Sequence, residues 1–567
     1  MFPSKVPRVF VFASVVLLFL VTYTTLHLYH RAPPSYPAVD PQFLPFKDAI
    51  IPEGQPDADH PAAAESTPEV IPPSFVTPRP SPTGKDEEPA WKSKTHNAPS
   101  APSRPSAEPI GPAGDATAVN KPGEEQQQLL PDPKLCSQDL EFLVRSSIDL
   151  ELTERVHYIR RYIKPAFSDT VDRNAIVNIT EPLVKGEVEV DLYKCGKVTV
   201  PQSEPITLVV PKPHPKTTFA HLMFGVATDY KRLNDSIVPF THWISGTGAK
   251  LVASVTDAKE ISPEDIDRLR RSFETAGINV TLVKPISGDF STSQNHFAVL
   301  INMLQHDNPE IEWYGLIDDD TFFPDLKPLS DSLAILDHKV DAYVGALSED
   351  FQSVRSFGFM AFGGAGAYLS APLAKKLSDQ ALQCIHDATT KEGDTILRDC
   401  VYSNSKAKLT ILPGLYQQDI RDDASGFFEA GLRPLNLHHW KSWYKSPVER
   451  MAKVSKLCGD CFLQRWRFGQ DTVFSNGFSI VEYVDGVQSV NLQLMEGTWG
   501  KADSKDFDFS LGPLRQPYPA DRKKSYTLRE AEFTQNGDLR QLYVRAGDSS
   551  SNEDELDQVI ELIWQSN

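Results

Sequence analysis

Three consecutive acids, Asp318, Asp319 and Asp320, follow an apolar-aromatic run in the stretch "WYGLIDDDTFF". A row of like charges is usually a solvated loop. The run before these acids, however, has the composition of a buried strand, and carboxylates at a strand end can bind a divalent cation. Mg²⁺ or Mn²⁺ typically takes one or two carboxylates together with the phosphates of a substrate. The triplet is therefore a candidate site for a metal and a diphosphate.

Other metal sites fit the sequence less well. A calcium loop that starts at Asp318 would need glycine at its sixth position and glutamate at its twelfth, where Phe323 and Leu329 stand. The "CGDC" at 458–461 lacks the second ligand pair that a tetrahedral zinc site requires. A two-metal phosphodiester hydrolase would need a larger cluster of Asp and His than this spacing supplies.

A second acidic feature is "EGD" at 392–394, at the expected start of a helix and between two cysteines. Acids in the first turn of a helix commonly complement its dipole. A carboxylate of this kind beside a sugar-sized pocket can also remove a proton from a hydroxyl. Glu392 and Asp394 are therefore candidates for a general base.

Two further motifs lie downstream of the triplet. "GGAG" at 363–366 allows positive φ and close approach of a ligand to the backbone, although a tight turn explains it equally well. His438 and His439 in "LHHW" are by default ordinary surface or core residues, and they become metal candidates only beside an acid pair.

The elements that must position these residues alternate between strands and helices. Strands are expected at 221–228, 250–257, 278–283, 312–318 and 340–347, and helices at 262–277 and 293–305. The stretch 357–377 is expected to run from a strand through the glycines into a helix. This alternation predicts a mainly parallel sheet with helices on both faces, in which ligands bind at the carboxyl ends of the strands. The aspartate triplet falls at such an end.

The flanking regions differ from this α/β part. Residues 147–163 have the charge pattern of a helix, and the part from about 446 onward has the alternating pattern of strands and turns. Trp466 in that part is expected to pack in the core, with sugar stacking as the alternative. The segment near "DELDQVIELIW" is expected to be a strand or a short helix. We divide the chain into a catalytic domain at 131–455 and a β-rich accessory region at 456–567.

Charge and composition limit the partners. The chain has 567 residues, a net charge of −19 and 40% hydrophobic residues. Nucleic acid is not an expected partner, because phosphate binding needs clustered Lys and Arg. A bound cation or a phosphate–metal complex fits an acidic chain better.

The first 130 residues predict a membrane anchor and a stem. Residues 9–29 carry no charge and are long enough to span a bilayer, while Lys5 and Arg8 precede them, so that 1–8 would be cytoplasmic. A cleaved signal peptide is the alternative, but the apolar run exceeds the usual signal core. Residues 30–130 hold nearly half of the 45 prolines and are expected to be a disordered stem.

The rest of the chain would then be lumenal. Six cysteines in that part predict disulfides, with Cys384–Cys400 as the first pair and Cys458 and Cys461 also bonded, whereas the partners of Cys136 and Cys195 stay open. Three sequons are candidate N-glycosylation sites: Asn178, Asn234 and Asn279.

The order of these motifs resembles a known family. "DDDTFF", then "GGAGAYLS", then "EGD" between two cysteines, then a histidine, is similar to the Fringe-related β-1,3-glycosyltransferases of glycosyltransferase family 31, and most of all to their uncharacterised fungal and plant branch. The matching motifs lie between about 220 and 445. The resemblance implies a GT-A fold, a Rossmann-like mixed sheet flanked by helices, in a single-pass type II protein of the Golgi membrane.

The resemblance also implies an activity and roles for individual residues. It implies inverting transfer of a hexose or N-acetylhexosamine from a UDP-sugar, with Mn²⁺ or Mg²⁺, to a glycan or glycoprotein acceptor. Asp320 would bind the metal, Asp318 the metal or the ribose, and Asp394 would be the base. The remaining implied roles are donor binding by Thr228 and Asp319, an acceptor and sugar pocket formed by Gly364, Ala365, Gly366 and Glu392, and a metal-binding histidine supplied by His438 or His439.

The chain departs from the family pattern at two positions. Tyr416 stands where the family has a metal-binding histidine, and Gly393 stands at the first acid of the usual pair. A non-catalytic lumenal lectin or assembly factor with the same fold is therefore the second hypothesis. This hypothesis predicts either that UDP and Mn²⁺ do not bind or that their binding does not depend on Asp320. The donor sugar, the acceptor, the linkage and the oligomeric state are not specified by these residues.

Overall fold

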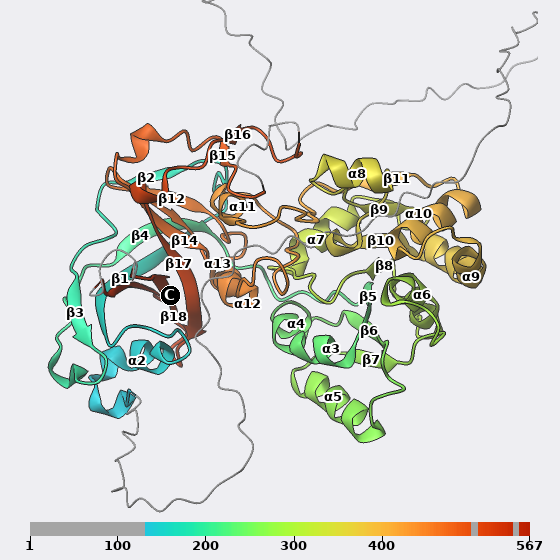
Figure 1. Ribbon diagram of the computed structural model, residues 1–567, viewed down its shortest axis with the longest axis horizontal. Helices are drawn as coiled ribbons and strands as arrows, with labels where there is room; N and C mark the ends of the chain where they lie inside the picture. The colour runs from blue at the N-terminus through green and yellow to red at the C-terminus, as the bar shows by residue number, and fades with distance from the viewer. Residues whose placement is uncertain (1–130, 501–507, 548–554, 567) are drawn as a thin grey trace, which may run out of the picture. The chain divides into compact units, whose positions relative to one another are not determined.

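The computed structural model describes residues 131–500, 508–547 and 555–566, which all fall within one compact unit (Figure 1). The expected anchor at 9–29 and the expected stem at 30–130 lie outside these residues. Among the described helices, none has the length and apolar character needed to cross a bilayer.

A seven-stranded sheet carries the candidate site. Its strand order is β11-β9-β10-β8-β5-β6-β7, and every neighbouring pair is parallel except the two that β10 makes. The sheet confirms the expected mixed α/β architecture, and β5 to β9 agree with the expected strands to within a few residues, whereas β10 and β11 were not expected. The strands of this sheet are β5 (Leu222–Thr228), β6 (Lys250–Val255), β7 (Val280–Val283), β8 (Trp313–Leu316), β9 (Tyr343–Gly345), β10 (Ala367–Ser370) and β11 (Leu409–Ile411).

Helices pack on both faces of this sheet, as the alternating pattern predicts. Alternate residues of β5 point to opposite sides, so that Met223 joins one apolar cluster and Phe224 the other. On the side of Met223 lie α6 (Thr292–Gln305), α9 (Ala371–Asp387) and α10 (Gly393–Asn404). On the other side lie α4 (Ile237–Ile244), α5 (Pro263–Thr275) and α7 (Leu326–Ala334). The short helices α3 (Tyr230–Asp235) and α8 (Phe351–Phe357) follow β5 and β9.

One part of the sheet differs from expectation. The glycine motif was expected to follow a strand and to lead into a helix, but Gly363–Ala365 form a 3-10 turn before strand β10. Gly366 ends that turn with φ +89°, and a Cβ there would lie 2.7 Å from the hydroxyl oxygen of Tyr368. Only glycine fits this position, and the turn delivers the chain into the antiparallel strand.

A second sheet of ten strands combines the two ends of the described chain. Its order is β2-β12-β13-β14-β17-β18-β19-β1-β3, with β4 also paired to β1. In Figure 1 the cyan-green strands β1, β3 and β4 accordingly lie among the orange and red C-terminal strands. Its strands are β1 (Arg155–Ser168), β2 (Val177–Ile179), β3 (Val188–Asp191), β4 (Ile206–Pro211), β12 (Arg465–Phe468), β13 (Thr472–Ser475), β14 (Ser479–Tyr483), β17 (Lys523–Phe533), β18 (Leu539–Arg545) and β19 (Asp557–Trp564).

This sheet corrects two expectations. The segment 147–163 is not one helix, because α2 (Glu141–Ser147) ends at its start and β1 occupies its second half. Strand β1 pairs in parallel with β19. The strands between 155 and 211 therefore belong to the sheet of the C-terminal region, not to that of the expected catalytic domain. Charged residues suggested a helix, but Arg160 and Arg161 are buried and paired with acids.

The C-terminal expectations are otherwise confirmed. The region after 456 is rich in strands, and the segment near the end is strand β19. Trp466 is fully buried and stacks on Phe474 with ring centroids 5.5 Å apart, which is the expected core role. Its indole is therefore not available to a sugar.

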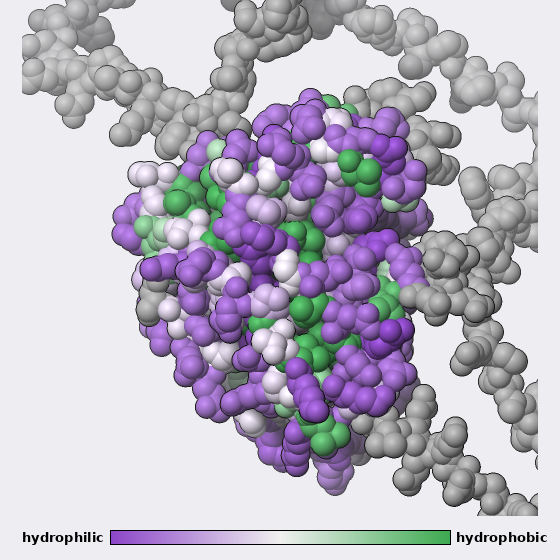
Figure 2. All heavy atoms as spheres, turned by 90° about the vertical axis from the view of Figure 1, so that its left-hand side faces the viewer, coloured by the Kyte–Doolittle hydropathy of each residue, from purple (hydrophilic) through white to green (hydrophobic). Residues whose placement is uncertain are grey.

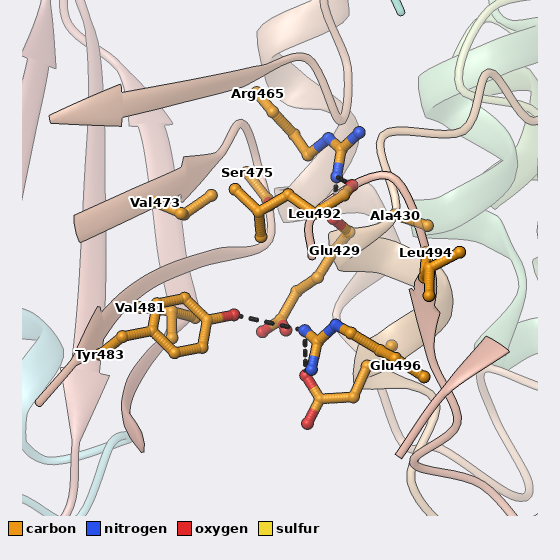
Figure 3. Close-up of a pocket in the computed structure, with 12 residues that line it drawn as sticks. Glu429, Ala430, Arg465, Val473, Ser475, Val481, Tyr483, Leu492, Leu494 and Glu496 are labelled. Atoms are coloured by element: carbon orange, nitrogen blue, oxygen red, sulfur yellow. Dashed lines mark hydrogen bonds and ion pairs between the residues drawn. The ribbon is translucent and has the colours of Figure 1, made fainter. Parts of the chain in front are cut away.

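A buried ionic cluster, of which Figure 3 labels Glu429 and Glu496, joins this sheet to a neighbouring helix. Glu429 ends helix α11 (Ser425–Glu429), and it accepts from Lys523 at 2.8 Å. Glu496 accepts from Lys523 at 3.0 Å and from Arg515 at 2.7 Å. The cavity between these side chains has a volume of about 10 Å³, the size of one water molecule. The cluster is therefore a structural tie, too small to be a ligand site.

All six cysteines are paired. The bonds Cys384–Cys400 and Cys458–Cys461 confirm the expected disulfides, and Cys136–Cys195 supplies the pairing that the sequence left open. The face in Figure 2 shows hydrophobic side chains in separate patches between hydrophilic ones, a normal protein surface. The side chains of all three sequon asparagines lie on exposed positions.

Candidate active site

The aspartate triplet lies at the switch point of the seven-stranded sheet. Strand β5 is flanked by β6 on one side and by β8 on the other, and all three run parallel. The connections therefore leave the ends of β5 and β8 in opposite directions, which opens a crevice between them. Thr228 ends β5, and Asp318 follows β8 by two residues. In open parallel sheets this is where ligands bind.

Each aspartate of the triplet has its own partners, which offsets their mutual repulsion. Asp320 lies against His438, with Oδ1 3.1 Å from Nε2. Asp318 lies between two histidines: its Oδ1 is 3.3 Å from His296 Nδ1, and its Oδ2 is 3.4 Å from His438 Nε2. Although burial alone would raise it, the hydrogen bond with His438 and the charge of His296 hold the pKa of Asp318 far below its usual value.

Asp319 points away from these histidines. Its carboxylate accepts from Arg232 at 2.8 and 3.0 Å, from Lys441 at 2.7 Å and from the Thr228 hydroxyl at 3.2 Å. Arg232 and Lys441 thus fix the turn between β8 and the following segment, and both were missed in the sequence. Thr228 and Asp319, expected to bind the donor, contact each other here.

His438 is positioned by a short antiparallel bridge and by its own ring. Leu437 and Phe322 exchange two backbone hydrogen bonds, of 2.7 and 2.8 Å, and so bring the histidine segment alongside the triplet. The Nδ1–H of His438 donates to the carbonyl of Gln417 at 2.7 Å. Its Nε2 therefore faces the carboxylates of Asp318 and Asp320. Burial would lower the pKa of His438, but the hydrogen bonds to these two carboxylates raise it well above its usual value.

The glycine turn supports this arrangement from behind. The carbonyl of Gly364 accepts from the Thr321 hydroxyl at 3.1 Å and from the Asn436 amide at 3.2 Å. The N–H of Ala365 donates to Gln417 Oε1 at 2.9 Å. Gly364, Ala365 and Gly366 are buried and do not line the cavity, although they were expected to. Ala365 instead holds Gln417, which does line it.

Asp394 faces the triplet from the first turn of α10. Its Oδ2 accepts from the N–H of Gly363 at 2.8 Å. Burial raises the pKa of Asp394 to about 6, the charge of His296 opposes this rise, and the charge of Asp318 adds to it. A carboxylate of this pKa is suited to accept a proton near neutral pH. Glu392 precedes it as the N-cap of α10 and lies at the edge of the same cavity.

The second histidine has a different environment. His439 has φ +56°, its Nε2 lies 3.1 Å from Asp419 Oδ1, and its ring stacks on Trp443 with centroids 3.6 Å apart. A carboxylate oxygen of Asp320 and one ring nitrogen each of His438 and His439 could still reach a common ion. Tyr416, at the position where the family has histidine, packs its ring edge-on to Phe427 and takes no part in this group.

These groups enclose one cavity of about 730 Å³, which is large enough for a nucleotide sugar. The cavity brings together the expected residues Thr228, Asp318, Asp319, Asp320, Glu392, Asp394, His438 and His439. It also includes His296, Arg232, Gln417 and Trp443, which sequence reasoning missed. Of these, only Arg232 had an available signal, because residues directly after a parallel strand are natural site candidates.

One family model matches part of the chain. A family described as "Protein of unknown function, DUF604" matches residues 352–559, a range that contains Asp394 and His438 but not the triplet. No curated protein matches the chain.

Several solved structures resemble part of the chain. The mannosyltransferase PcManGT from Pyrobaculum calidifontis, solved with GDP-Man and Mn²⁺, has 12% identity and a TM-score of 0.26 over 37% of this chain and 60% of its own. The glycosyltransferase GlyE of Streptococcus pneumoniae TIGR4 has 16% identity and a TM-score of 0.23, with 33% and 44% covered. Mouse xyloside xylosyltransferase 1 has 12% identity and a TM-score of 0.23, with 34% and 84% covered.

All three similar structures are glycosyltransferases. The chain spans less than two thirds of the length of the first two.

Proposed function

We propose that this chain is a metal-dependent glycosyltransferase that transfers a hexose or N-acetylhexosamine from a UDP-sugar, with inversion, to a glycan or glycoprotein acceptor. The observation that carries the proposal is the convergence of two carboxylates and a histidine on one side of a cavity with a carboxylate of raised pKa on the other. Asp318, Asp320 and His438 form the first group, and Asp394 is the second. The ordered motifs shared with the Fringe-related family support the same activity and suggest a β-1,3 linkage, such as a galactosyl bond.

The first group fits a divalent cation. Because the Nδ1–H of His438 is committed to the Gln417 carbonyl, neutral His438 would direct an acceptor nitrogen at the acceptor oxygens of Asp318 and Asp320. Such a group needs a proton or a cation between its members. The 3.1 Å between His438 Nε2 and Asp320 Oδ1 matches two neighbouring ligands of an ion with bonds of about 2.1 Å.

In this proposal, individual residues have separate roles in binding the metal and in transferring the proton. Asp320 and His438 would hold Mn²⁺ or Mg²⁺ with Asp318, and the bound ion would neutralise the charge that develops on the departing diphosphate. The Nδ1–H of His438 donates to a backbone carbonyl, and a contact of this kind usually orients a metal-binding imidazole. Asp394 would accept the proton of the acceptor hydroxyl, which then attacks the anomeric carbon on the face opposite the diphosphate.

The setting of the protein is part of the same proposal. Three disulfides are typical of an oxidising compartment, and the three exposed sequon asparagines fit a lumenal surface. With residues 9–29 as the anchor, the protein would be a type II membrane protein of the Golgi.

The test is hydrolysis of a panel of UDP-sugars by the full-length protein, with and without Mn²⁺. We expect hydrolysis that requires Mn²⁺ and falls by at least about a hundredfold in Asp320→Ala. Asp267→Ala, which removes an exposed acid on α5, is the matched control and should keep wild-type activity. A folded wild type that binds neither UDP nor Mn²⁺ would contradict the proposal and support the lectin or assembly role.

A further inference from the structure

His296 connects the two halves of the candidate site. Its Nδ1 lies 3.3 Å from Asp318 Oδ1, and its Nε2 lies 3.6 Å from Asp394 Oδ1. The side chain is only 8% exposed, although it borders the cavity. Within the described part of the chain, Nε2 makes no hydrogen bond. A buried ring thus spans from the metal-side carboxylate to the base, with a polar atom directed at Asp394.

Two glycines allow the close packing of α6 that places His296 between Asp318 and Asp394. A Cβ on Gly225 of β5 would lie 2.4 Å from the sulfur of Met303, so glycine lets α6 pack closely on the sheet. A Cβ on Gly393 would lie 2.1 Å from the carbonyl oxygen of Ser293, so glycine also lets the start of α10 approach the first turn of α6. His296 follows directly after that turn.

A third glycine leaves room for the contact itself. A Cβ on Gly363 would lie 2.9 Å from His296 Nε2 and 2.8 Å from Asp394 Oδ1. At Gly363 the ring and the Asp394 carboxylate therefore meet backbone only, with no side chain between them. Gly225 and Gly393 thus set the position of α6, and Gly363 leaves room for the imidazole itself, whereas the apolar face of α6 is filled by Phe297 and Leu300.

We propose that His296 is a positioning residue that holds Asp318 and Asp394 at a fixed separation, with Nδ1 serving the first carboxylate and Nε2 the second. The inference rests on the proposed function and deepens it. A transferase of this kind must keep its base at a set distance from the diphosphate end of the donor, because misplacement by about 1 Å can cost a hundredfold in rate. A rigid ring between the two carboxylates sets that distance.

The inference also explains the departure at Gly393. The Fringe-related pattern that the chain resembles would place an acid there, whereas this chain has a glycine that allows Ser293 and the start of α6 to come close. In place of that acid, the imidazole of His296 lies beside Asp394. On this account Gly393 reflects a different support for the base, not a loss of activity.

Two near-isosteric substitutions separate the two contacts. The amide nitrogen of His296→Asn can replace Nδ1 and keep the hydrogen bond to Asp318, and that of His296→Gln can replace Nε2 and reach Asp394. His296→Ala removes both. The matched control is His386→Ala, because His386 is 83% exposed on α9. Each full-length variant is studied by calorimetric titration with Mn²⁺ and by UDP-sugar hydrolysis at saturating Mn²⁺.

We expect a reciprocal pattern. His296→Asn should bind Mn²⁺ within about threefold of wild type but lose at least about tenfold in kcat, with the donor KM unchanged. His296→Gln should keep kcat within about threefold at saturating Mn²⁺ but bind Mn²⁺ at least about tenfold more weakly. His296→Ala should show both losses.

Other outcomes overturn the inference. If the Asn and Gln variants behave alike, whether as wild type or as His296→Ala, the ring does not serve the two carboxylates separately. Failure of all three variants to fold would give His296 a packing role only. If the wild type hydrolyses no UDP-sugar, the proposed function fails, and the Mn²⁺ titrations still decide: the Gln variant must then bind Mn²⁺ more weakly than the Asn variant.

Discussion

The ring of His438 lies directly against the backbone of Gly364: a Cβ on Gly364 would be 2.1 Å from His438 Cε1 and 2.4 Å from Nε2. The glycine turn and His438 are far apart in the sequence, but in the structure the His438 ring packs directly on the backbone of Gly364. Gly364 therefore matters because a side chain there would occupy the space of the His438 ring, which we propose as a metal ligand.

The contact between Gly364 and His438 predicts what a single methyl group added at Gly364 would do. Gly364→Ala should displace His438 and weaken Mn²⁺ binding by about ten- to a hundredfold, the range found when the support of a metal ligand is lost. Calorimetric titration with Mn²⁺ measures the change. Gly497→Ala is the control, because a Cβ there meets its nearest neighbour at 3.5 Å, which is an ordinary contact. Equal Mn²⁺ affinity of the two variants would contradict the claim that the contact with Gly364 positions His438 for the metal.

The raised pKa of Asp394 predicts the acid side of the pH–rate profile. Its pKa is about 6, because burial disfavours the charged form. A base must be ionised to act, so kcat/KM should fall about tenfold per pH unit below pH 6 and level off above it. Asp394→Asn should lower the rate at least about a hundredfold at all pH values. A profile that stays flat down to pH 4.5, or activity of the Asn variant near wild type, would exclude Asp394 as the base.

Glu349 predicts a pH effect on stability near the same site. It is 3% exposed, and its two carboxylate oxygens accept from the N–H groups of Gln417 and Asp419, which flank the loop that orients His438. Burial raises the pKa of Glu349 from 4.5 to about 7. The folded state therefore binds this proton more tightly than the unfolded state, and the stabilisation is present below pH 4.5 and is lost as the pH rises through 7.

The size of the loss follows from the shift. A difference of about 2.5 pKa units corresponds to about 3 kcal/mol in the free energy of unfolding. Urea unfolding of wild type and Glu349→Gln at pH 4.5 and pH 8 should show that the wild type loses about this much relative to the variant. Glu310→Gln, at an exposed position, should show no such difference. A pH-independent gap between wild type and Glu349→Gln would rule out a raised pKa.

The sequence predicted the first sheet and much of the candidate site for a clear physical reason. Strands such as β5 and β6 are short apolar runs bounded by turn residues, and helix α5 carries its Ser262 N-cap in the sequence. These are local signals. Placing Asp318–Asp320 at a strand end followed from them directly, as did Asp394 at the start of α10.

The missed features depend on contacts between distant segments. Strand β1 is charged, and its arginines are acceptable in a buried strand because Arg160 pairs with Glu561 of the neighbouring β19 and Arg161 with Glu181. His296 lies on a helix whose pattern explains it as a core residue until α10 is seen to approach. The choice of His438 as the residue facing the acids required the bridge between Leu437 and Phe322. No local pattern contains these pairings.

The measurement that tests the central claim most directly is calorimetric titration of the full-length protein with UDP in the presence and absence of Mn²⁺, for wild type and Asp320→Asn. The substitution keeps the shape of the side chain and removes the charge that faces His438. We predict that wild type binds UDP at least about tenfold more tightly with Mn²⁺ than without it, and that Asp320→Asn abolishes this dependence. Tight UDP binding that is unaffected by Mn²⁺ and by Asp320→Asn would contradict a metal-dependent nucleotide-sugar site.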